Sequence, residues 1–187
     1  MLIRQERPSD VRAIRAVTAA AFRGVDHSAP SIEPDGAPGE ATLVEWLRAD
    51  PGWVPELSLV AEPGPAPASA AATTELIGHV VATRGRLGDL PALGLGPLSV
   101  HPAHQTRGVG SALMHTVLGA AETMGEPVVV LLGEPAYYSR FGFVAASTLG
   151  IEAPDPAWGD YFQARALSAW DGQRSGRFRY AAPFDRL

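Results

Sequence analysis

The chain has 187 residues, a formal net charge of −5 and no cysteine. A chain of this length can bury a substantial core as one domain without covalent staples. The lack of cysteine excludes disulfides, thiolate metal ligands and a cysteine nucleophile. The acidic balance argues against binding to nucleic-acid backbones. All 15 basic residues are arginines, so the protein offers no lysine side chain for modification.

Three further features argue against other classes of protein. Residues 1–7 are charged and lack the apolar stretch of a secretory signal. No apolar run approaches the roughly 20 residues that span a bilayer. The five histidines show neither H-x-H nor H-E-x-x-H spacing, which argues against a metal site. We therefore expect a cytoplasmic protein that binds no metal, membrane or nucleic acid.

Hydrophobic periodicity predicts the elements of the N-terminal half. Apolar residues recur at helical spacing in the segments 10–22 and 40–49, which a loop rich in glycine and proline (24–38) separates. The stretch 62–74 is mainly proline, alanine, serine and threonine and predicts a mobile low-complexity loop. Short apolar runs predict strands at 2–4, 57–61, 75–83 and 93–100.

The C-terminal half continues the mixed pattern. A helix is predicted at 107–123, followed by a continuous apolar strand at 128–132 that suits cover on both faces. A short helix at 135–141 ends at Gly142. The remaining predictions are strands at 143–145, 163–168 and 178–182 and a loop at 150–160. The pattern predicts a single domain, residues 1–187, of the α+β or mixed α/β class.

The stretch from Gly96 to Leu113 carries the most chemical information. An apolar strand ends before Pro102, and a short loop then places Gly108 and Gly110 at the start of a helix. Glycine lets a ligand approach the backbone, and unpaired N–H groups at a helix start attract anions. Arg107 and its positive charge lie beside them. The stretch predicts a pyrophosphate cradle, although it matches neither a P-loop nor the G-x-G-x-x-G fingerprint.

This stretch resembles the acetyl-CoA signature of the GNAT superfamily of N-acyltransferases, as Val-x-Pro-x-x-Gln-x-x-Gly-x-Gly from Val100 to Gly110. The block Gly-Glu-Pro-Ala-Tyr-Tyr-Ser-Arg-Phe-Gly-Phe from Gly133 to Phe143 resembles the C-terminal half of that fold in a bacterial subgroup. The similarity continues at 161–163 and 180–184, so it covers nearly the whole chain. It implies a mixed, mostly antiparallel sheet flanked by helices.

By this resemblance, the sheet would splay between the strands 93–100 and 127–132, with acetyl-CoA as acyl donor in the gap. Backbone groups of Leu98 and Val100 would bind the pantetheine arm like an added strand. N–H groups from Thr106 to Ser111 would hold the pyrophosphate. The residues implied to bind the cofactor are Leu98, Ser99, Val100, Gln105, Thr106, Arg107, Gly108, Val109, Gly110 and Ser111.

The implied reaction is attack of an amine on a thioester, which needs a stabilised oxyanion and a proton for the leaving thiolate. The backbone N–H of Val100 is the candidate oxyanion donor. Tyr138 lies four residues before Gly142, where family members with an identified general acid carry tyrosine. Its phenol, with a pKa near 10, is protonated at neutral pH. Alternatively, Tyr138 is a packed aromatic, and Tyr137 beside it is expected in the core or a substrate wall.

The general base has several candidates. Glu134 follows a strand that borders the predicted gap, but it is also placed to cap the next helix. His101, Glu40 and His27 are further candidates from the surrounding segments. A bound water would make a dedicated base unnecessary. The sequence leaves these alternatives open.

The acceptor is the least determined part of the reaction. The loops 24–38 and 150–160 could fold over a small molecule, which favours a small-molecule amine over a protein acceptor. The alternative function is a non-catalytic acyl-CoA-binding module, acting as a sensor or interaction partner. A homodimer is compatible with such folds, although the sequence shows no interface.

Overall fold

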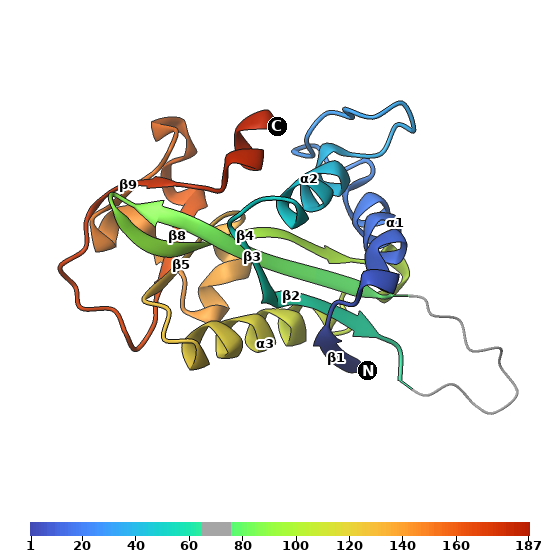
Figure 1. Ribbon diagram of the computed structural model, residues 1–187, viewed down its shortest axis with the longest axis horizontal. Helices are drawn as coiled ribbons and strands as arrows, with labels where there is room; N and C mark the ends of the chain where they lie inside the picture. The colour runs from blue at the N-terminus through green and yellow to red at the C-terminus, as the bar shows by residue number, and fades with distance from the viewer. Residues whose placement is uncertain (65–75) are drawn as a thin grey trace, which may run out of the picture.

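The computed structural model describes residues 1–64 and 76–187 (Figure 1). The predicted loop 62–74 lies outside these residues apart from its first three. In the described part, nine strands form a sheet with the order β1-β2-β3-β4-β5-β8-β6, to which β7 and β9 attach beside this path. The strands are β1 (Leu2–Gln5), β2 (Trp53–Glu62), β3 (Gly78–Leu87), β4 (Leu90–Val100), β5 (Val128–Leu132), β6 (Val144–Ala145), β7 (Ile151–Glu152), β8 (Phe162–Ala166) and β9 (Gly176–Arg179).

Four α-helices and six short 3-10 turns complete the described chain. Helix α3 covers one face of the sheet, while α1 and α2 cover the other with the C-terminal segment beside α2 (Figure 1). The helices are α1 (Val11–Phe22), α2 (Gly39–Arg48), α3 (Val109–Thr123) and α4 (Pro135–Tyr138). The 3-10 turns are η1 (Pro8–Asp10), η2 (Pro102–His104), η3 (Ser139–Phe141), η4 (Ala146–Leu149), η5 (Pro156–Tyr161) and η6 (Ala182–Arg186).

Alternation along the strands divides the core between the two faces. Leu93 and Leu95 of β4 pack in the cluster under α3, together with Leu113 and Val117 of that helix. Strand residues whose side chains point to the other face pack on the α1/α2 side. Val81 of β3 belongs to this second cluster, together with residues of both helices. A third cluster fills the end of the sheet formed by β5, β8 and β9. In the described residues, no helix combines the length and hydropathy needed to cross a bilayer.

The central hairpin β3–β4 carries a β-bulge. Val80 pairs with Leu98 and Ala82 with Leu95, so two residues of β4, Gly96 and Pro97, oppose the single residue Val81. Bulges bend and twist the strand that contains the extra residue. Proline is tolerated here because a bulge relieves it of a ladder hydrogen bond.

Next to the bulge, β4 parts from β5. The two parallel strands pair at Leu93↔Val129 and Gly94↔Val130, and their recorded pairing ends there although β4 runs on to Val100. We call this unpaired region, 95–100 of β4 and 131–132 of β5, the splay. It confirms the predicted mixed sheet with an opening between these two strands.

Several predicted boundaries are wrong. The strand predicted at 75–83 continues to Leu87, because its later residues pair with the start of β4. The predicted loop 150–160 contains β7 and η5, since Ile151 pairs with Gly176 of β9. The last predicted strand ends at Arg179 and gives way to η6. Short strands that pair with segments distant in the sequence leave little local pattern. Their bounds therefore cannot be predicted from the sequence alone.

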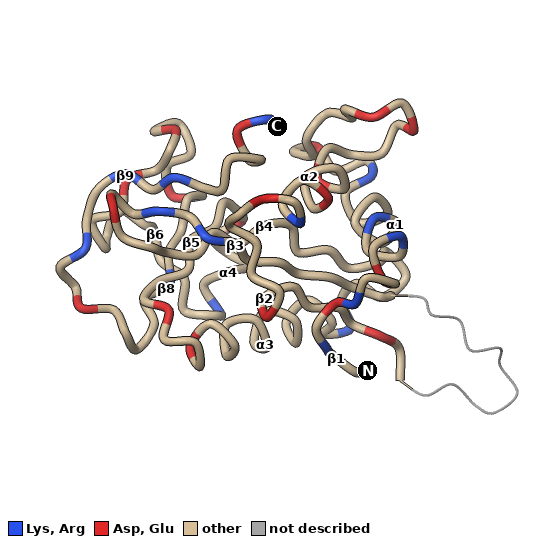
Figure 2. Tube along the Cα trace, viewed as in Figure 1, with Lys and Arg blue, Asp and Glu red and all other residues tan. Residues whose placement is uncertain are grey.

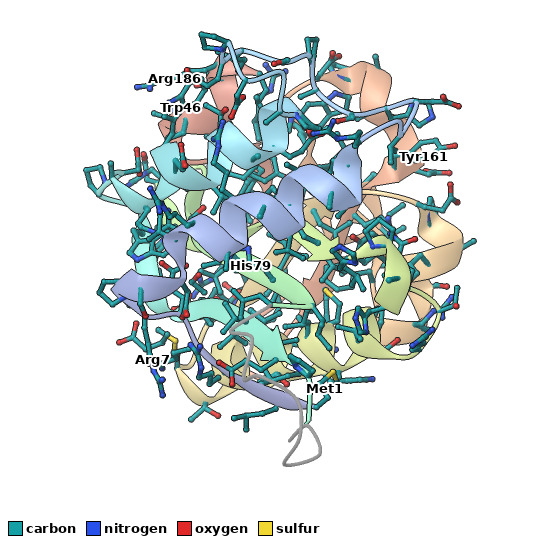
Figure 3. The ribbon with its side chains drawn as sticks, turned by 90° about the vertical axis from the view of Figure 1, so that its right-hand side faces the viewer. Met1, Arg7, Trp46, His79, Tyr161 and Arg186 are labelled. Carbon is teal, nitrogen blue, oxygen red and sulfur yellow. The ribbon has the colours of Figure 1, made fainter. Side chains whose placement is uncertain are left out.

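A buried polar cluster links β2, β3 and Glu6, the residue after β1, to Arg48 of α2. The His79 ring, fully buried behind α1 in Figure 3, has Nε2 3.1 Å from the Ser58 hydroxyl and 3.7 Å from the Glu6 carboxylate. Burial lowers the pKa of His79 below its usual value despite that carboxylate. Burial acts to raise the pKa of Glu6, but hydrogen bonds from His79, Arg48 and Ser58 outweigh it and hold this pKa at about 2.

These shifts predict acid-sensitive stability. With the pKa of His79 depressed, the folded protein stays neutral there while the unfolded chain takes up a proton below pH about 6.5, so unfolding becomes easier as pH falls. The slope is at most about 1.4 kcal/mol per pH unit for one group. We expect the Tm to fall between pH 7.5 and 5.5 in thermal melts. Glu6 adds a further loss below pH about 4.5, as the pH approaches its depressed pKa.

The matched variants are His79→Gln and His115→Gln. The first replaces the buried ring and should flatten the fall between pH 7.5 and 5.5, whereas the second replaces an exposed histidine and should leave it intact. Equal pH dependence in both variants would contradict the assignment to His79.

Candidate active site

The loop between β4 and α3 is the segment predicted to form the pyrophosphate cradle. Thr106 and Gly108 both have left-handed backbone conformations, with φ of 61° and 83°. A non-glycine residue in this region is uncommon and concentrates at functional sites. Helix α3 begins at Val109, two residues later than predicted, because Gly108 is its left-handed N-cap. The first helical bond runs from Ala112 N–H to the Gly108 carbonyl at 3.0 Å, so the preceding amides lack a helical acceptor.

The cradle is therefore open to an anion at its glycine. A Cβ added at Gly108 would have no atom within 4 Å. Arg107, one residue earlier, is exposed and forms no ion pair with a described residue. Free amides, a helix N-terminus and an unpaired guanidinium together suit the pyrophosphate of a nucleotide-derived ligand.

The edge of β4 that faces the splay offers backbone groups. His101 N–H donates to the Ile77 carbonyl at 3.0 Å, and Val100 lies opposite Gly78. In an antiparallel ladder, this places the N–H and C=O groups of Val100 and Leu98 on the side away from β3. An extended ligand in the splay can pair with them as an extra strand. The Gln105 side chain donates to the Val100 carbonyl at 3.1 Å, which anchors the cradle loop to this edge.

Tyr138 borders the splay from the α3 side. Its ring lies directly on Gly133, where a side chain would overlap the ring, and it also packs near Phe143 with centroids 5.9 Å apart. Leu131, two residues before Gly133, belongs to the cluster under α3, which fixes the face. Burial, followed by the neighbouring Tyr137, raises the pKa of Tyr138 above its ordinary value. The phenol is therefore protonated at neutral pH.

Comparison with known proteins decides the family. A model of the acetyltransferase (GNAT) domain matches residues 3–146. The Escherichia coli (strain K12) protein YhbS, an uncharacterised N-acetyltransferase, is 32% identical over 193 residues, covering 100% of both chains. The chain belongs to the GNAT acetyltransferases. It is an acetyl-CoA-dependent N-acyltransferase.

Solved structures of GNAT proteins agree with this fold. A GNAT family acetyltransferase from Brucella melitensis, crystallised with acetyl-CoA, has a TM-score of 0.73 and 33% identity, with 98% of this chain and 97% of that chain covered. The structure of Escherichia coli YhbS in complex with CoA has a TM-score of 0.80 and 28% identity, covering 100% of this chain and 92% of that one. These complexes are consistent with acetyl-CoA as the acyl donor.

Tyr137 packs partly buried against the core, one of the two places predicted for it, and its hydroxyl reaches α3. A Cβ added at Gly110 would lie 2.7 Å from the Tyr137 hydroxyl, so this side chain reaches the first turn of α3. The Arg140 guanidinium lies over the same ring, 4.8 Å from its centroid, and donates to the Tyr137 carbonyl at 2.9 Å. Glycine is therefore needed at position 110 to make room for the Tyr137 hydroxyl. At position 108 it is favoured by the left-handed backbone conformation, in open surroundings.

Ser99 lies differently from its neighbours Leu98 and Val100, and its contact with the cofactor stays a prediction. It is fully buried, and its hydroxyl donates to Thr18 of α1 at 3.1 Å. Its backbone pairs with His79 of β3, which turns its main-chain groups away from the splay. Both kinds of polar group therefore already have partners in the protein.

Each candidate base with a recorded contact has a structural role. Glu134 is the N-cap of α4 and accepts from Ala136 N–H at 3.3 Å. The Glu40 carboxylate accepts from the Ser28 hydroxyl at 2.8 Å and from Ala29 N–H at 2.7 Å, which fastens the 24–38 loop to α2. His101 caps η2 through Ala103 N–H, while His27 is exposed on the loop. These contacts single out none of them as the base, and Glu134 stays a prediction.

Sequence reasoning missed Tyr180, which follows β9. Its ring packs on Gly94, where an added Cβ would lie 2.6 Å from the Tyr180 ring. Gly94 is the last residue of β4 recorded as paired with β5. The similarity of 180–184 to the family was the available signal, but it did not say which face of the sheet this residue would occupy.

Two hollows in the described surface lie away from this GNAT site. One, of about 450 Å³, is lined by Gly150, Ile151, Asp160 and Arg177 among others, near β7 and η5. The other, of about 520 Å³, lies between the middle of α3 and the end of β8. Neither includes the cradle or the splay, so we base the site on backbone geometry and side-chain placement.

Two glycines of α3 give a matched test of the Tyr137 contact. A Cβ at Gly119 would have no atom within 4 Å, whereas one at Gly110 would meet the Tyr137 hydroxyl. Alanine is preferred to glycine inside a helix by roughly 0.5–1 kcal/mol. We therefore expect Gly119→Ala to raise the free energy of unfolding. Overpacking should make Gly110→Ala less stable than Gly119→Ala by about 1 kcal/mol or more in denaturant titrations. Equal gains would contradict the contact.

Proposed function

We propose that this enzyme transfers the acetyl group of acetyl-CoA to the primary amine of a small molecule by direct attack in a ternary complex. The observation that carries the proposal is that three groups suited to the reaction lie around one opening in the sheet. The free edge of β4, the cradle at Gly108 and the Tyr138 phenol all border the same splay. A donor held along that edge would present its thioester between the two strands.

The chemistry assigns two groups of the chain to the transfer. The amine nitrogen forms a bond to the thioester carbonyl carbon, the carbon–sulfur bond breaks, and the products are an amide and free CoA. The Val100 N–H, turned away from β3, would donate to the carbonyl oxygen as negative charge develops there. One proton leaves the amine nitrogen and one equivalent ends on the thiol, so the reaction is balanced without another reagent.

Tyr138 is best placed as a hydrogen-bond donor to the leaving sulfur. Its pKa lies above the ordinary 10, whereas a thiol has a pKa near 8.5. Complete proton transfer from phenol to thiolate is therefore uphill by at least about 2 kcal/mol. The proton that the thiol keeps would come ultimately from the amine, with water able to carry it.

Two features bear on the acceptor. The 24–38 loop is fastened to α2 through Glu40 and to α1 through the Arg15–Asp35 pair at 2.6 Å, which suits an enclosed acceptor better than an open protein groove. Acidic and basic segments alternate along the described trace (Figure 2). The overall charge pattern therefore gives little long-range selection for a cationic acceptor. The cytoplasmic location expected from residues 1–7 stays a prediction.

Calorimetric titration with acetyl-CoA tests the donor site. Gly108→Trp should weaken acetyl-CoA binding at least tenfold, because the indole would fill the open side of the cradle. Gly125→Trp is the matched control. Gly125 also has a positive φ of 73° and open surroundings, but it follows the opposite end of α3. It carries the same backbone strain and should bind acetyl-CoA normally.

Either of two results would count against this donor site. Folded wild-type protein that binds neither acetyl-CoA nor CoA would refute the proposed acetyl transfer. Equal loss of binding in both tryptophan variants would show that strain, rather than blocked approach, is responsible. Tight binding without turnover of any amine would favour the alternative of a non-catalytic acyl-CoA-binding module.

A second experiment addresses Tyr138. Tyr138→Phe keeps the ring on Gly133 but removes the donor, so kcat should fall about 10²-fold, within the range for general acid–base groups. The affinity for acetyl-CoA in calorimetry should change little. Unchanged kcat would assign Tyr138 to packing only.

A further inference from the structure

Tyr180 lies at the apex of the splay, on the face opposite Tyr138. Gly94, on which its ring packs, pairs with Val130, and both residues face away from α3. Tyr138 packs on Gly133 at the other face. Each ring approaches the backbone at a glycine, and the two tyrosines flank the point where β4 and β5 part.

The C-terminal segment holds Tyr180 in place. Its ring centroid lies 4.5 Å from that of Phe184 and 4.8 Å from that of Phe178. The segment is in turn docked on α2, where the Arg186 guanidinium lies 5.1 Å from the Trp46 ring centroid (Figure 3). A ring fixed on several sides positions its hydroxyl with little freedom.

The Tyr180 hydroxyl has no hydrogen-bond partner in the part of the chain that the structure describes. Its oxygen is buried as well. A buried unpaired hydroxyl costs on the order of 1–3 kcal/mol, so native proteins retain few of them. Its phenol is coupled to that of Tyr138, because a charge on Tyr138 would raise the pKa of Tyr180 further beyond the increase caused by burial. Both phenols are therefore protonated and uncharged at neutral pH.

We infer that Tyr180 is an acceptor-binding residue whose hydroxyl oxygen accepts a hydrogen bond from the N–H of the attacking amine. This inference rests on the proposed function. The cradle and Tyr138 lie on the α3 side, so the donor approaches from there, and the amine must reach the thioester from the face that carries Tyr180. An N–H bond held by Tyr180 directs the nitrogen lone pair toward the apex.

The surroundings of Tyr180 suit a neutral amine. The rings recorded near it are aromatic: Phe162, Trp158, Phe178 and Phe184. An apolar environment disfavours the ammonium form and therefore favours the nucleophilic one. No dedicated base is then needed at this position, which agrees with the structural roles found for Glu134 and Glu40.

The decisive variant is Tyr180→Phe, with Tyr161→Phe as control because the Tyr161 side chain is 55% exposed whereas the Tyr180 hydroxyl is buried. Removal of an unpaired buried hydroxyl should leave the Tm equal or higher. Calorimetric binding of acetyl-CoA should be unchanged. With the best substrate from a panel of n-butylamine, phenylethylamine and spermidine, kcat/KM for the amine should fall at least tenfold. Tyr161→Phe should match the wild type in all three measurements.

A binding measurement covers the case in which none of these amines is turned over. The chain has four tyrosines, so protein labelled with ¹³Cζ-tyrosine gives few resonances, which the tyrosine-to-phenylalanine variants assign. Titration of the CoA complex with n-butylamine should shift the Tyr180 resonance and leave that of Tyr161 in place.

The outcomes separate the two hypotheses. A Tm lowered by several degrees in Tyr180→Phe would reveal a structural partner for the hydroxyl and overturn the inference. An unshifted Tyr180 resonance together with unchanged amine kinetics would also overturn it. Failure of the proposed function itself would appear separately, as wild-type protein that does not bind acetyl-CoA.

Discussion

The parting of β4 from β5 is the constraint on which the rest of the structure depends. A bulge at Gly96 and Pro97 bends β4 just after its last pairing with β5. Unpaired strand edges are normally covered or blunted because they invite further pairing. Here the edge is kept free between covered faces, and the loop that follows it leads directly into the start of α3, where we propose that the anion binds. One local irregularity thus serves both halves of the donor site.

Glycine recurs wherever this arrangement brings a ring or a ligand onto the backbone. Gly94 and Gly133 accept the rings of Tyr180 and Tyr138 on opposite faces, and Gly110 leaves room for the Tyr137 hydroxyl. These positions tolerate little substitution for steric reasons, whereas Gly108 is fixed by its backbone conformation. Glycine is therefore required in this site for two different reasons: close packing at some positions and a left-handed backbone at another.

The parts of the site predicted from the sequence are those encoded in contiguous residues. The strand end, glycine turn and helix start of the proposed cradle could be predicted because they lie within 96–113, and the sheet opening followed from the family resemblance. The side-chain partners of Ser99 and Glu40 could not, since Thr18 and the 24–38 loop come from distant segments. Likewise, nothing local to 178–184 indicates that Tyr180 returns to Gly94, because that contact is set by β9 pairing with β3.

The groups proposed to bind the donor and the acceptor lie in different stretches of the chain, which has an evolutionary consequence. The family model spans residues 3–146, which contain the cradle, the splay and Tyr138, whereas β9, η6 and Tyr180 lie beyond it. Donor recognition and acceptor contact would thus be encoded in separate stretches joined by a common sheet. Substitutions in the C-terminal stretch could then diversify the accepted amine in descendants of one ancestor while the shared machinery for the acyl donor is preserved.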